Sequence, residues 1–354
     1  MIVAMLVRGS IPAALCVLLL VVSALGVRAD PPTTPAPAGI AVDADGNVYV
    51  SDYALDRVLK LGSDGSVLGQ WGGSGSSPGQ FSAPFGLAVE ERTLYVVDQL
   101  NSRVQKFASD GTVLAGWGGP GAGSGELRTP FGVAVAGSRV YVADFGNDRV
   151  QFFATDGTPL GSVGVRGSGD GQFLRPAGVA VDRDGALYVT DHFNDRIQKF
   201  SSDGHFVLQI GSVAAVVSTT TATPVLTPQT TSTPTLLPDA QLRRPEGIAI
   251  DRDGSVWVAD YGRDRVVKFG SDGHFVLAIG GSGEFAGPKG VAVDPASGRI
   301  YVADTGNARV VRLAPDGTVE STIALQAPAG AATPTTTPVP ATPLPTTTPT
   351  PQPG

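Results

Sequence analysis

The chain has 354 residues, with 25 Lys and Arg against 32 Asp and Glu, so its formal net charge is −7 at neutral pH. An acidic chain argues against a nucleic-acid partner, because such binding draws much of its affinity from Lys and Arg that neutralise phosphates. Cys16 is the single cysteine and lies in an apolar N-terminal run, so the rest of the chain has no thiol for a disulfide, a nucleophile or a metal site.

Residues 1–29 have the pattern of a secretory signal peptide. Arg8 precedes an almost wholly apolar run from Ile11 to Val27, and Ala29 provides a small residue at the cleavage position. The alternative is an uncleaved membrane anchor, because these 17 apolar residues are just long enough to cross a bilayer. We therefore expect a secreted or cell-surface protein that contacts a membrane only if this segment is retained. Residues 30–37 follow as a short Pro/Thr spacer.

Residues 38–326 contain six copies of one repeat. In each copy a glycine is followed by an apolar run, a second β-rich run ends in aspartate, an arginine leads the third run, and Asp-Gly precedes the fourth. Asp-Gly between such runs is typical of β-hairpins, because a tight hairpin turn requires positive φ. Six units of four strands predict an all-β fold, a six-bladed β-propeller of four-stranded antiparallel blades. The aligned glycines are Gly39, Gly86, Gly132, Gly178, Gly247 and Gly290.

The blades are predicted to run in chain order with one long interruption. Blade 1 spans Ala38 to Gly72 and blade 4 spans Ala177 to Gly211, while blades 2, 3, 5 and 6 begin at Phe85, Phe131, Glu246 and Lys289. A Thr/Pro-rich insertion, residues 212–240, separates blades 4 and 5, and a Thr/Pro-rich tail follows at 327–354. Segments of this composition cannot build a core, so we expect both to be disordered.

The copies resemble NHL repeats, whose pattern is close to PxGIAVDxDGxIYVADxxNxRIQxF. The resemblance covers roughly residues 37–323 and suggests an NHL-repeat propeller of the exported bacterial type. It implies the six-bladed fold. It does not imply one function, since the family includes RNA-binding, protein-binding, sensor and lyase members.

An aspartate, usually an asparagine three residues later and an arginine two beyond it recur at the end of the second predicted strand. A catalytic residue is needed once, whereas this set appears in every copy. We therefore interpret it as structural, with Asp and Asn satisfying loop backbone groups and Arg bridging the turn or the next blade. The set comprises Asp52, Arg57, Asp98, Asn101, Arg103, Asp144, Asn147, Arg149, Asp191, Asn194, Arg196, Asp260, Arg265, Asp304, Asn307 and Arg309.

Two positions vary from copy to copy: the residue after that aspartate and the residue before the repeated glycine. In a four-stranded blade, the loop from strand two to strand three and the loop to the next blade open on the same face, so both positions ring one mouth. Aromatic faces with a few polar groups suit a protein, peptide, glycan or small organic ligand. The alternative is a surface without a binding function, at which sequence variation is tolerated. The predicted ring comprises Tyr53, Phe85, Gln99, Phe131, Phe145, His192, Glu246, Tyr261, Lys289 and Thr305.

The three histidines do not form a predicted metal site. His192 belongs to the mouth, but His205 and His274 follow Asp-Gly in hairpins that open on the opposite face. The zinc-dependent amidating lyases that resemble this fold rely on histidines around the axis, so this departure argues against that activity. We predict no metal and no cofactor. Calcium on the channel axis, as in the lactonases with a similar propeller, stays open because the sequence cannot rank inward carboxylates.

Three segments resemble half of a calcium loop: DADGN at 43–47, DRDGA at 182–186 and DRDGS at 251–255. A helix-loop-helix calcium site beginning at Asp43 would require an acid at the position of Ala54. We therefore interpret these segments as tight hairpin turns.

The sequence favours an extracellular, non-catalytic recognition scaffold that binds a protein, peptide or glycan at one face of a monomeric propeller. No nucleic-acid partner is expected, although a local basic patch stays open because Arg243, Arg244 and Lys289 lie near blade junctions. The alternative is an enzyme resembling the propeller lyases or lactonases, with catalysis at the axial mouth by Tyr, His or Arg. No individual catalytic residue is assigned.

Overall fold

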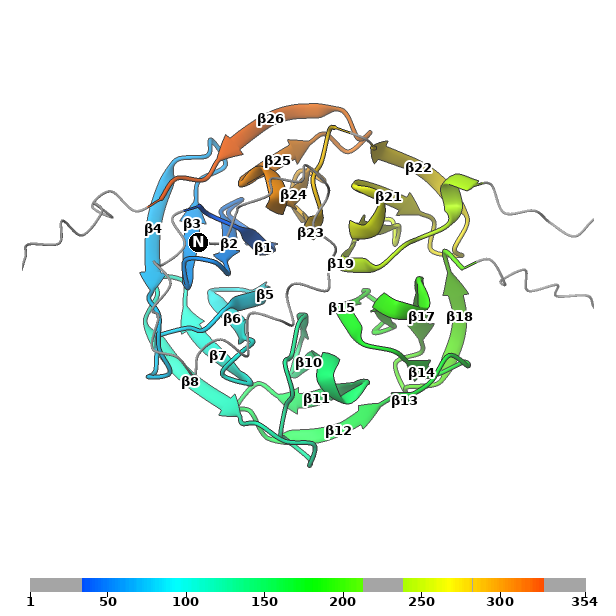
Figure 1. Cartoon of the computed structure of the whole chain (residues 1–354), viewed down its shortest axis with the longest axis horizontal. Helices are drawn as coiled ribbons and strands as arrows, with labels where there is room; N and C mark the ends of the chain where they lie inside the picture. The colour runs from blue at the N-terminus through cyan, green and yellow to red at the C-terminus, as the bar shows by residue number, and fades with distance from the viewer. Residues whose placement is uncertain (1–33, 213–237, 282, 328–354) are drawn as a thin grey trace, which may run out of the picture.

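The computed structural model describes residues 34–212, 238–281 and 283–327. The predicted signal peptide, nearly all of the insertion and nearly all of the tail lie outside the described residues. Six four-stranded antiparallel sheets surround a central axis (Figure 1), which confirms the predicted propeller and its number of blades. No helix in the described part of the chain is long and apolar enough to span a bilayer.

Each blade is built from four consecutive strands, ordered from the axis to the rim. Blades 1 to 3 contain β1 (Pro37–Val42), β2 (Val48–Asp52), β3 (Arg57–Leu61), β4 (Val67–Gly72), β5 (Pro84–Glu90), β6 (Thr93–Asp98), β7 (Arg103–Ala108), β8 (Val113–Gly118), β9 (Val133–Ala136), β10 (Arg139–Asp144), β11 (Arg149–Ala154) and β12 (Pro159–Val163).

Blades 4 to 6 contain β15 (Pro176–Val181), β16 (Leu187–Asp191), β17 (Arg196–Phe200), β18 (Phe206–Ile210), β19 (Pro245–Ile250), β20 (Val256–Asp260), β21 (Arg265–Phe269), β22 (Phe275–Gly280), β23 (Pro288–Val293), β24 (Ile300–Asp304), β25 (Arg309–Leu313) and β26 (Val319–Ala324). Two short parallel strands, β13 (Val165–Arg166) and β14 (Gln172–Phe173), lie in the connection between blades 3 and 4. Most inner strands begin at the proline just before the predicted blade start.

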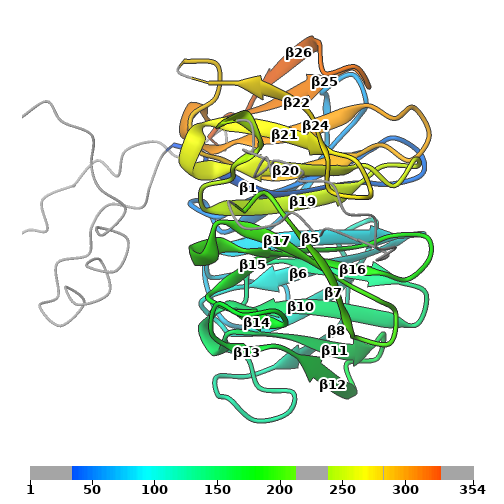
Figure 2. The same ribbon diagram turned by 90° about the vertical axis from the view of Figure 1, so that its right-hand side faces the viewer.

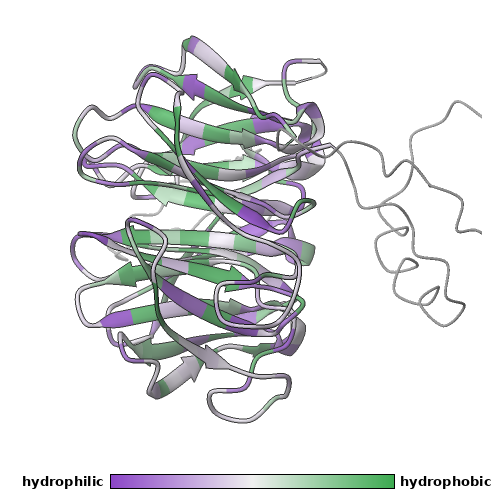
Figure 3. Ribbon diagram, turned by 90° about the vertical axis from the view of Figure 1, so that its left-hand side faces the viewer, coloured by the Kyte–Doolittle hydropathy of each residue, from purple (hydrophilic) through white to green (hydrophobic). Residues whose placement is uncertain are grey.

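The hydrophobic core lies between the blades. Every residue of β2 and of β20 is buried, because neighbouring blades cover both faces of these strands. One core cluster joins Val48 and Leu61 of blade 1 to Tyr301 of blade 6. In side view, hydrophobic residues run along the strands where blades face each other (Figure 3). The outermost strands are far more exposed, as the alternating pattern of β4 shows.

No strand is exchanged between the first and the last blade: β1 to β4 form blade 1, and β23 to β26 form blade 6. The hydroxyl of Thr305 donates a hydrogen bond of 2.6 Å to the carbonyl oxygen of Pro37. The guanidinium of Arg57 donates to the carbonyl oxygen of Gln326. Packing and side-chain hydrogen bonds therefore hold this junction.

The repeated glycines lie where the inner strands of adjacent blades approach most closely. A Cβ added to Gly39 would lie 2.1 Å from the carbonyl oxygen of Phe85, and a Cβ on Gly132 would lie 2.5 Å from that of Ala177. Such separations are too short for any real side chain, so the contact requires glycine. The same relation to the next blade occurs at Gly86, Gly178, Gly247 and Gly290. The glycine ring narrows the axial channel to a cavity of about 60 Å³.

Candidate functional site

Loops that join second to third strands, and loops that enter the next blade, open on one face of the disc. Viewed edge-on, the strands run from face to face and the loops gather on the two sides (Figure 2). Four of the variable residues begin short 3₁₀ turns at this face. These turns are η2 (Phe145–Asn147), η3 (His192–Asn194), η5 (Tyr261–Arg263) and η6 (Thr305–Asn307). We call this face the mouth.

The repeated Asp, Asn and Arg side chains hold these loops in place through hydrogen bonds and ion pairs. Asp98 is completely buried and accepts hydrogen bonds from the backbone N–H of Ser82 at 2.8 Å and from Asn101 Nδ2 at 2.9 Å. Arg103 Nε donates at 2.7 Å to Asp98 Oδ2, the oxygen that also accepts the Asn101 bond, while Arg103 Nη2 donates to the carbonyl of Gln80 in the loop entering the same blade. The Arg–Asp pair recurs at Arg57–Asp52, Arg149–Asp144, Arg196–Asp191, Arg265–Asp260 and Arg309–Asp304.

A second set of aspartates, which the sequence reasoning did not single out, braces the following loop in four blades: Asp56, Asp148, Asp195 and Asp264. The backbone N–H of Arg175 donates to Asp148 Oδ1 at 2.8 Å, and that of Arg244 donates to Asp195 Oδ1 at 2.7 Å. All four residues have positive φ. Strained, bonded loop positions of this kind hold a rigid surface. The signal in the sequence was an aspartate directly before the repeated arginine, at a position where blades 2 and 6 have Ser102 and Ala308.

Four predicted mouth residues form a continuous row of rings. Phe131 and Phe145 stack with their centroids 4.1 Å apart, Phe85 lies 4.5 Å from Phe131, and Tyr53 lies 6.2 Å from Phe85. All four side chains are partly exposed. Blades 1 to 3 therefore present one aromatic surface rather than isolated rings.

The row continues into blade 4 through residues outside the predicted ring. Phe193 is 48% exposed, and its ring lies 4.8 Å from His192 and 6.4 Å from Phe145. The Arg175 guanidinium lies 5.4 Å above the Phe145 ring. We call Tyr53, Phe85, Phe131, Phe145 and Phe193 the aromatic cluster. The sequence signal for Phe193 was a large ring at a position where the other copies have Ala, Leu or Gly.

Blades 5 and 6 add a buried ion pair beside the cluster. Lys289 Nζ lies 3.1 Å from Glu246 Oε1 and 4.3 Å from the centroid of the Tyr261 ring. Burial alone lowers the pKa of Lys289. The opposite effect of the Glu246 carboxylate, with Tyr261 and Tyr53, is larger, so the pKa of Lys289 lies above its ordinary value. Lys289 therefore stays charged, paired and in contact with aromatic faces.

His192 is buried at the edge of the cluster. Its Nδ1 lies 3.3 Å from the carbonyl oxygen of Pro245, which can only accept, so a neutral ring carries its proton on Nδ1. Burial lowers the pKa of His192 against the opposing effect of Glu246. The imidazole is therefore neutral at pH 7.

The other predicted residues occupy varied environments. Thr305 is buried, and its hydroxyl is bonded to Pro37. Gln99 is half-buried, and its backbone N–H donates to Ala83. His205 and His274 lie in exposed turns on the opposite face, away from His192.

Arginines flank the aromatic cluster over blades 3 to 5. Arg128 and Arg243 are exposed, Arg244 is half-buried, and none of the three side chains forms a salt bridge within the described ranges. Arg128 and Arg243 lie directly beside the η2 and η5 turns. With Arg175 they make the arginine rim, a set of guanidinium groups beside the aromatic cluster.

Metal ligands do not converge in the described part of the chain, where no three His, Cys, Asp or Glu side chains are close enough to hold an ion. The narrow axial cavity is lined by the glycine ring, apolar residues, Glu246 and Lys289. Axial calcium remains a prediction without a ligand set.

Comparison with known proteins supports the repeat assignment. The NHL repeat model matches residues 173–200, 242–269 and 285–313. These ranges lie in blades 4, 5 and 6. No curated protein sequence matches this chain.

Solved propellers share its fold. A streptogramin B lyase is 17% identical with a TM-score of 0.56, and the match covers 83% of this chain and 85% of the lyase. Hydrazine synthase of Kuenenia stuttgartiensis is 16% identical with a TM-score of 0.55, covering 83% and 98%. A gluconolactonase of Xanthomonas campestris is 20% identical with a TM-score of 0.51, covering 85% and 90%. At these identities the similarity concerns the fold alone.

Proposed function

We propose that this NHL-repeat propeller is a non-catalytic recognition scaffold whose mouth binds an acidic peptide segment of an extracellular protein. The observation that carries the proposal is the continuous, partly exposed aromatic cluster, which ends in the exposed ring of Phe193. Exposed aromatic surface on a rigid frame is typical of protein-binding sites, where a few ring contacts supply most of the affinity.

The arginine rim favours an acidic partner over a neutral one. Guanidinium groups bind carboxylates through paired hydrogen bonds, and the side chains of Arg128, Arg243 and Arg244 have no salt-bridge partner in the described residues. Lys289 adds little free charge, because Glu246 already neutralises it. The protein would act as a monomer that is secreted or held at the cell surface, as its N-terminal sequence predicts.

Binding is tested with a fluorescein-labelled peptide of glutamate and phenylalanine, compared with the same peptide carrying glutamine for glutamate. The acidic peptide binds more tightly, and its affinity falls as salt is raised. Replacing Phe131 and Phe145 with Ala weakens binding about tenfold or more. Leu68→Ala, which truncates an exposed residue on the rim strand β4, is the matched control and leaves binding unchanged.

The melting temperature separates recognition from packing. If the Phe131/Phe145 double variant unfolds, those rings are structural, and Phe193→Ala then decides the matter because this ring is largely exposed. Full binding by Phe193→Ala together with unfolding of the double variant contradicts the proposal. Equal binding of the acidic and glutamine peptides contradicts the proposal that the arginine rim selects an acidic partner.

A second candidate is a lyase, favoured by the neutral imidazole of His192, which is buried at the edge of the aromatic cluster. Such a group suits proton abstraction. A similar structure is a catalytically inactive histidine-to-alanine variant of virginiamycin B lyase from Staphylococcus aureus with quinupristin. Incubation with quinupristin, followed by chromatography, tests this candidate. Consumption that His192→Ala abolishes supports it, and an unchanged antibiotic contradicts it.

A further inference from the structure

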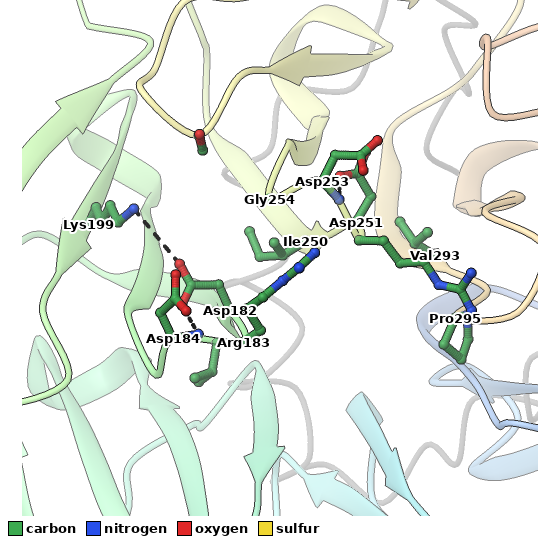
Figure 4. A pocket seen from close by; sticks show the side chains of 13 residues that line it. Asp182, Arg183, Asp184, Lys199, Ile250, Asp251, Asp253, Gly254, Val293 and Pro295 are labelled. Carbon is green, nitrogen blue, oxygen red and sulfur yellow. Dashed lines mark hydrogen bonds and ion pairs between the residues drawn. The ribbon is translucent and has the colours of Figure 1, made fainter.

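A second, larger cavity lies on the face opposite the mouth, over blades 4 to 6 (Figure 4). Its volume is about 980 Å³. The loop from β15 to β16 and the loop from β19 to β20 form two of its sides, and Val293 and Pro295 of blade 6 bound it further. First-to-second strand loops open away from the mouth, so this cavity shares no residue with the aromatic cluster.

The two loops have the same sequence, Asp-Arg-Asp-Gly, and the same internal bonds. Asp182 Oδ1 accepts backbone hydrogen bonds from Asp184 at 3.0 Å and from Ala186 at 2.8 Å. Asp251 Oδ1 accepts the equivalent bonds at 3.0 and 2.9 Å. The first aspartate of each loop therefore fixes the turn and holds the next two side chains outward.

Lysines pair with the second oxygen of each turn-forming aspartate. Lys199 Nζ lies 3.8 Å from Asp182 Oδ2, and Lys268 Nζ lies 3.1 Å from Asp251 Oδ2. The hydroxyl of Tyr188 also donates to Asp182 Oδ2. These charges are already paired and leave little for a ligand.

Four other side chains of the loops stay available. Arg183, Asp184, Arg252 and Asp253 are exposed, and their side chains have no hydrogen-bond or ionic partner among the described residues. Figure 4 shows Arg183 reaching from its own blade toward Ile250 of the next. The cavity thus offers two guanidinium groups and two carboxylates with no net free charge, above apolar side chains of Val181, Ile250 and Val293.

We propose that this cavity binds a neutral oligosaccharide. A sugar hydroxyl donates to a carboxylate and accepts from a guanidinium at once, so it uses both kinds of free group. A ligand of net charge would be attracted by one pair and repelled by the other. The apolar floor covers the C–H faces of sugar rings, and the volume is at the upper end of the range for ligand sites, which suits more than one ring.

The test is calorimetric titration of the full chain with cellohexaose, maltohexaose and chitohexaose. Hexagalacturonate serves as an acidic sugar and glycine betaine as a zwitterion. At least one neutral hexasaccharide binds, and the Arg183→Ala/Arg252→Ala double variant loses at least tenfold in affinity. The matched control is Arg92→Ala, an exposed arginine in the corresponding loop of blade 2, and it binds like the unaltered protein.

The outcomes separate the alternatives. Binding of hexagalacturonate or betaine without any neutral hexasaccharide overturns the proposal, and so does the absence of binding by all probes. Equal loss in Arg92→Ala shows that the sugar contacts another surface and also overturns it. Since both arginines are exposed, the double variant is expected to fold, and its melting temperature confirms this.

Discussion

Replacing Gly39 with Ala tests the closest contact between blades. The new Cβ would lie 2.1 Å from the carbonyl oxygen of Phe85 and 3.0 Å from the backbone nitrogen of Leu87. Restoring a 3.0 Å separation from the carbonyl requires the two inner strands to move apart by about 0.9 Å. The clashing atoms belong to the backbone, so no side-chain rotation relieves them.

We expect Gly39→Ala to lower the free energy of unfolding by about 3 kcal/mol, the upper end of the usual range for overpacking. For a domain of this size, that corresponds to a melting temperature lower by about 6 to 12 °C. Differential scanning calorimetry and urea unfolding monitored by tryptophan fluorescence measure both quantities.

Gly69→Ala in β4 is the matched control, because its added Cβ would meet only the Trp71 side chain at 3.8 Å. Its stability should be unchanged or higher by up to about 1 kcal/mol, since alanine reduces the entropy of the unfolded chain. Gly132→Ala, with a nearest contact of 2.5 Å, should fall between the two. If Gly39→Ala were as stable as Gly69→Ala, the close approach of neighbouring blade backbones would not explain why glycine recurs at this position.

Three further changes probe the ionisable groups. Asp144→Ala leaves a mostly buried guanidinium unpaired and should cost about 3 to 5 kcal/mol in urea unfolding, whereas Asp170→Ala, at an exposed aspartate with no side-chain partner among the described residues, should leave the midpoint nearly unchanged. Lys289→Met should destabilise the fold by leaving Glu246 buried without its partner, and the double change Lys289→Met/Glu246→Gln should recover most of the loss; additive losses would contradict their coupling. Burial lowers the pKa of His192 in the folded protein below 6.5, its value in the unfolded chain. Around these pH values the unfolded chain binds more protons, so the free energy of unfolding rises with pH. The unaltered protein should therefore lose more stability than His192→Gln between about pH 7.5 and about pH 5.5, and parallel pH profiles would refute this.

The repeat made the fold predictable from sequence. Six copies of the same hairpin signals determine strand order and blade number, because every copy repeats the same turn chemistry. The reason for the glycine was not predictable, since the atoms that exclude a Cβ belong to the neighbouring blade. Blade 3 shows the limit at boundaries: β9 begins at Val133, two residues after the predicted start.

The candidate site was predictable by position and less so by environment. Repeat alignment grouped Phe85, Phe131 and Phe145, and the rings of these three residues are in contact. It gave no sign that Thr305 is buried and bonded to the first blade, because the accepting carbonyl of Pro37 lies 268 residues earlier in the chain. Phe193 was missed because the alignment compared only the residue next to the aspartate.

The junction between blades 1 and 6 is the one place in the ring that no connecting peptide crosses. The two ends of the propeller lie in blades 1 and 6, so a force that pulls the ends apart acts first on the contacts between these two blades. Thr305 and Arg57 span this junction through two carbonyl groups, so a single-molecule pulling trace should begin with parting of these two blades before any sheet unravels.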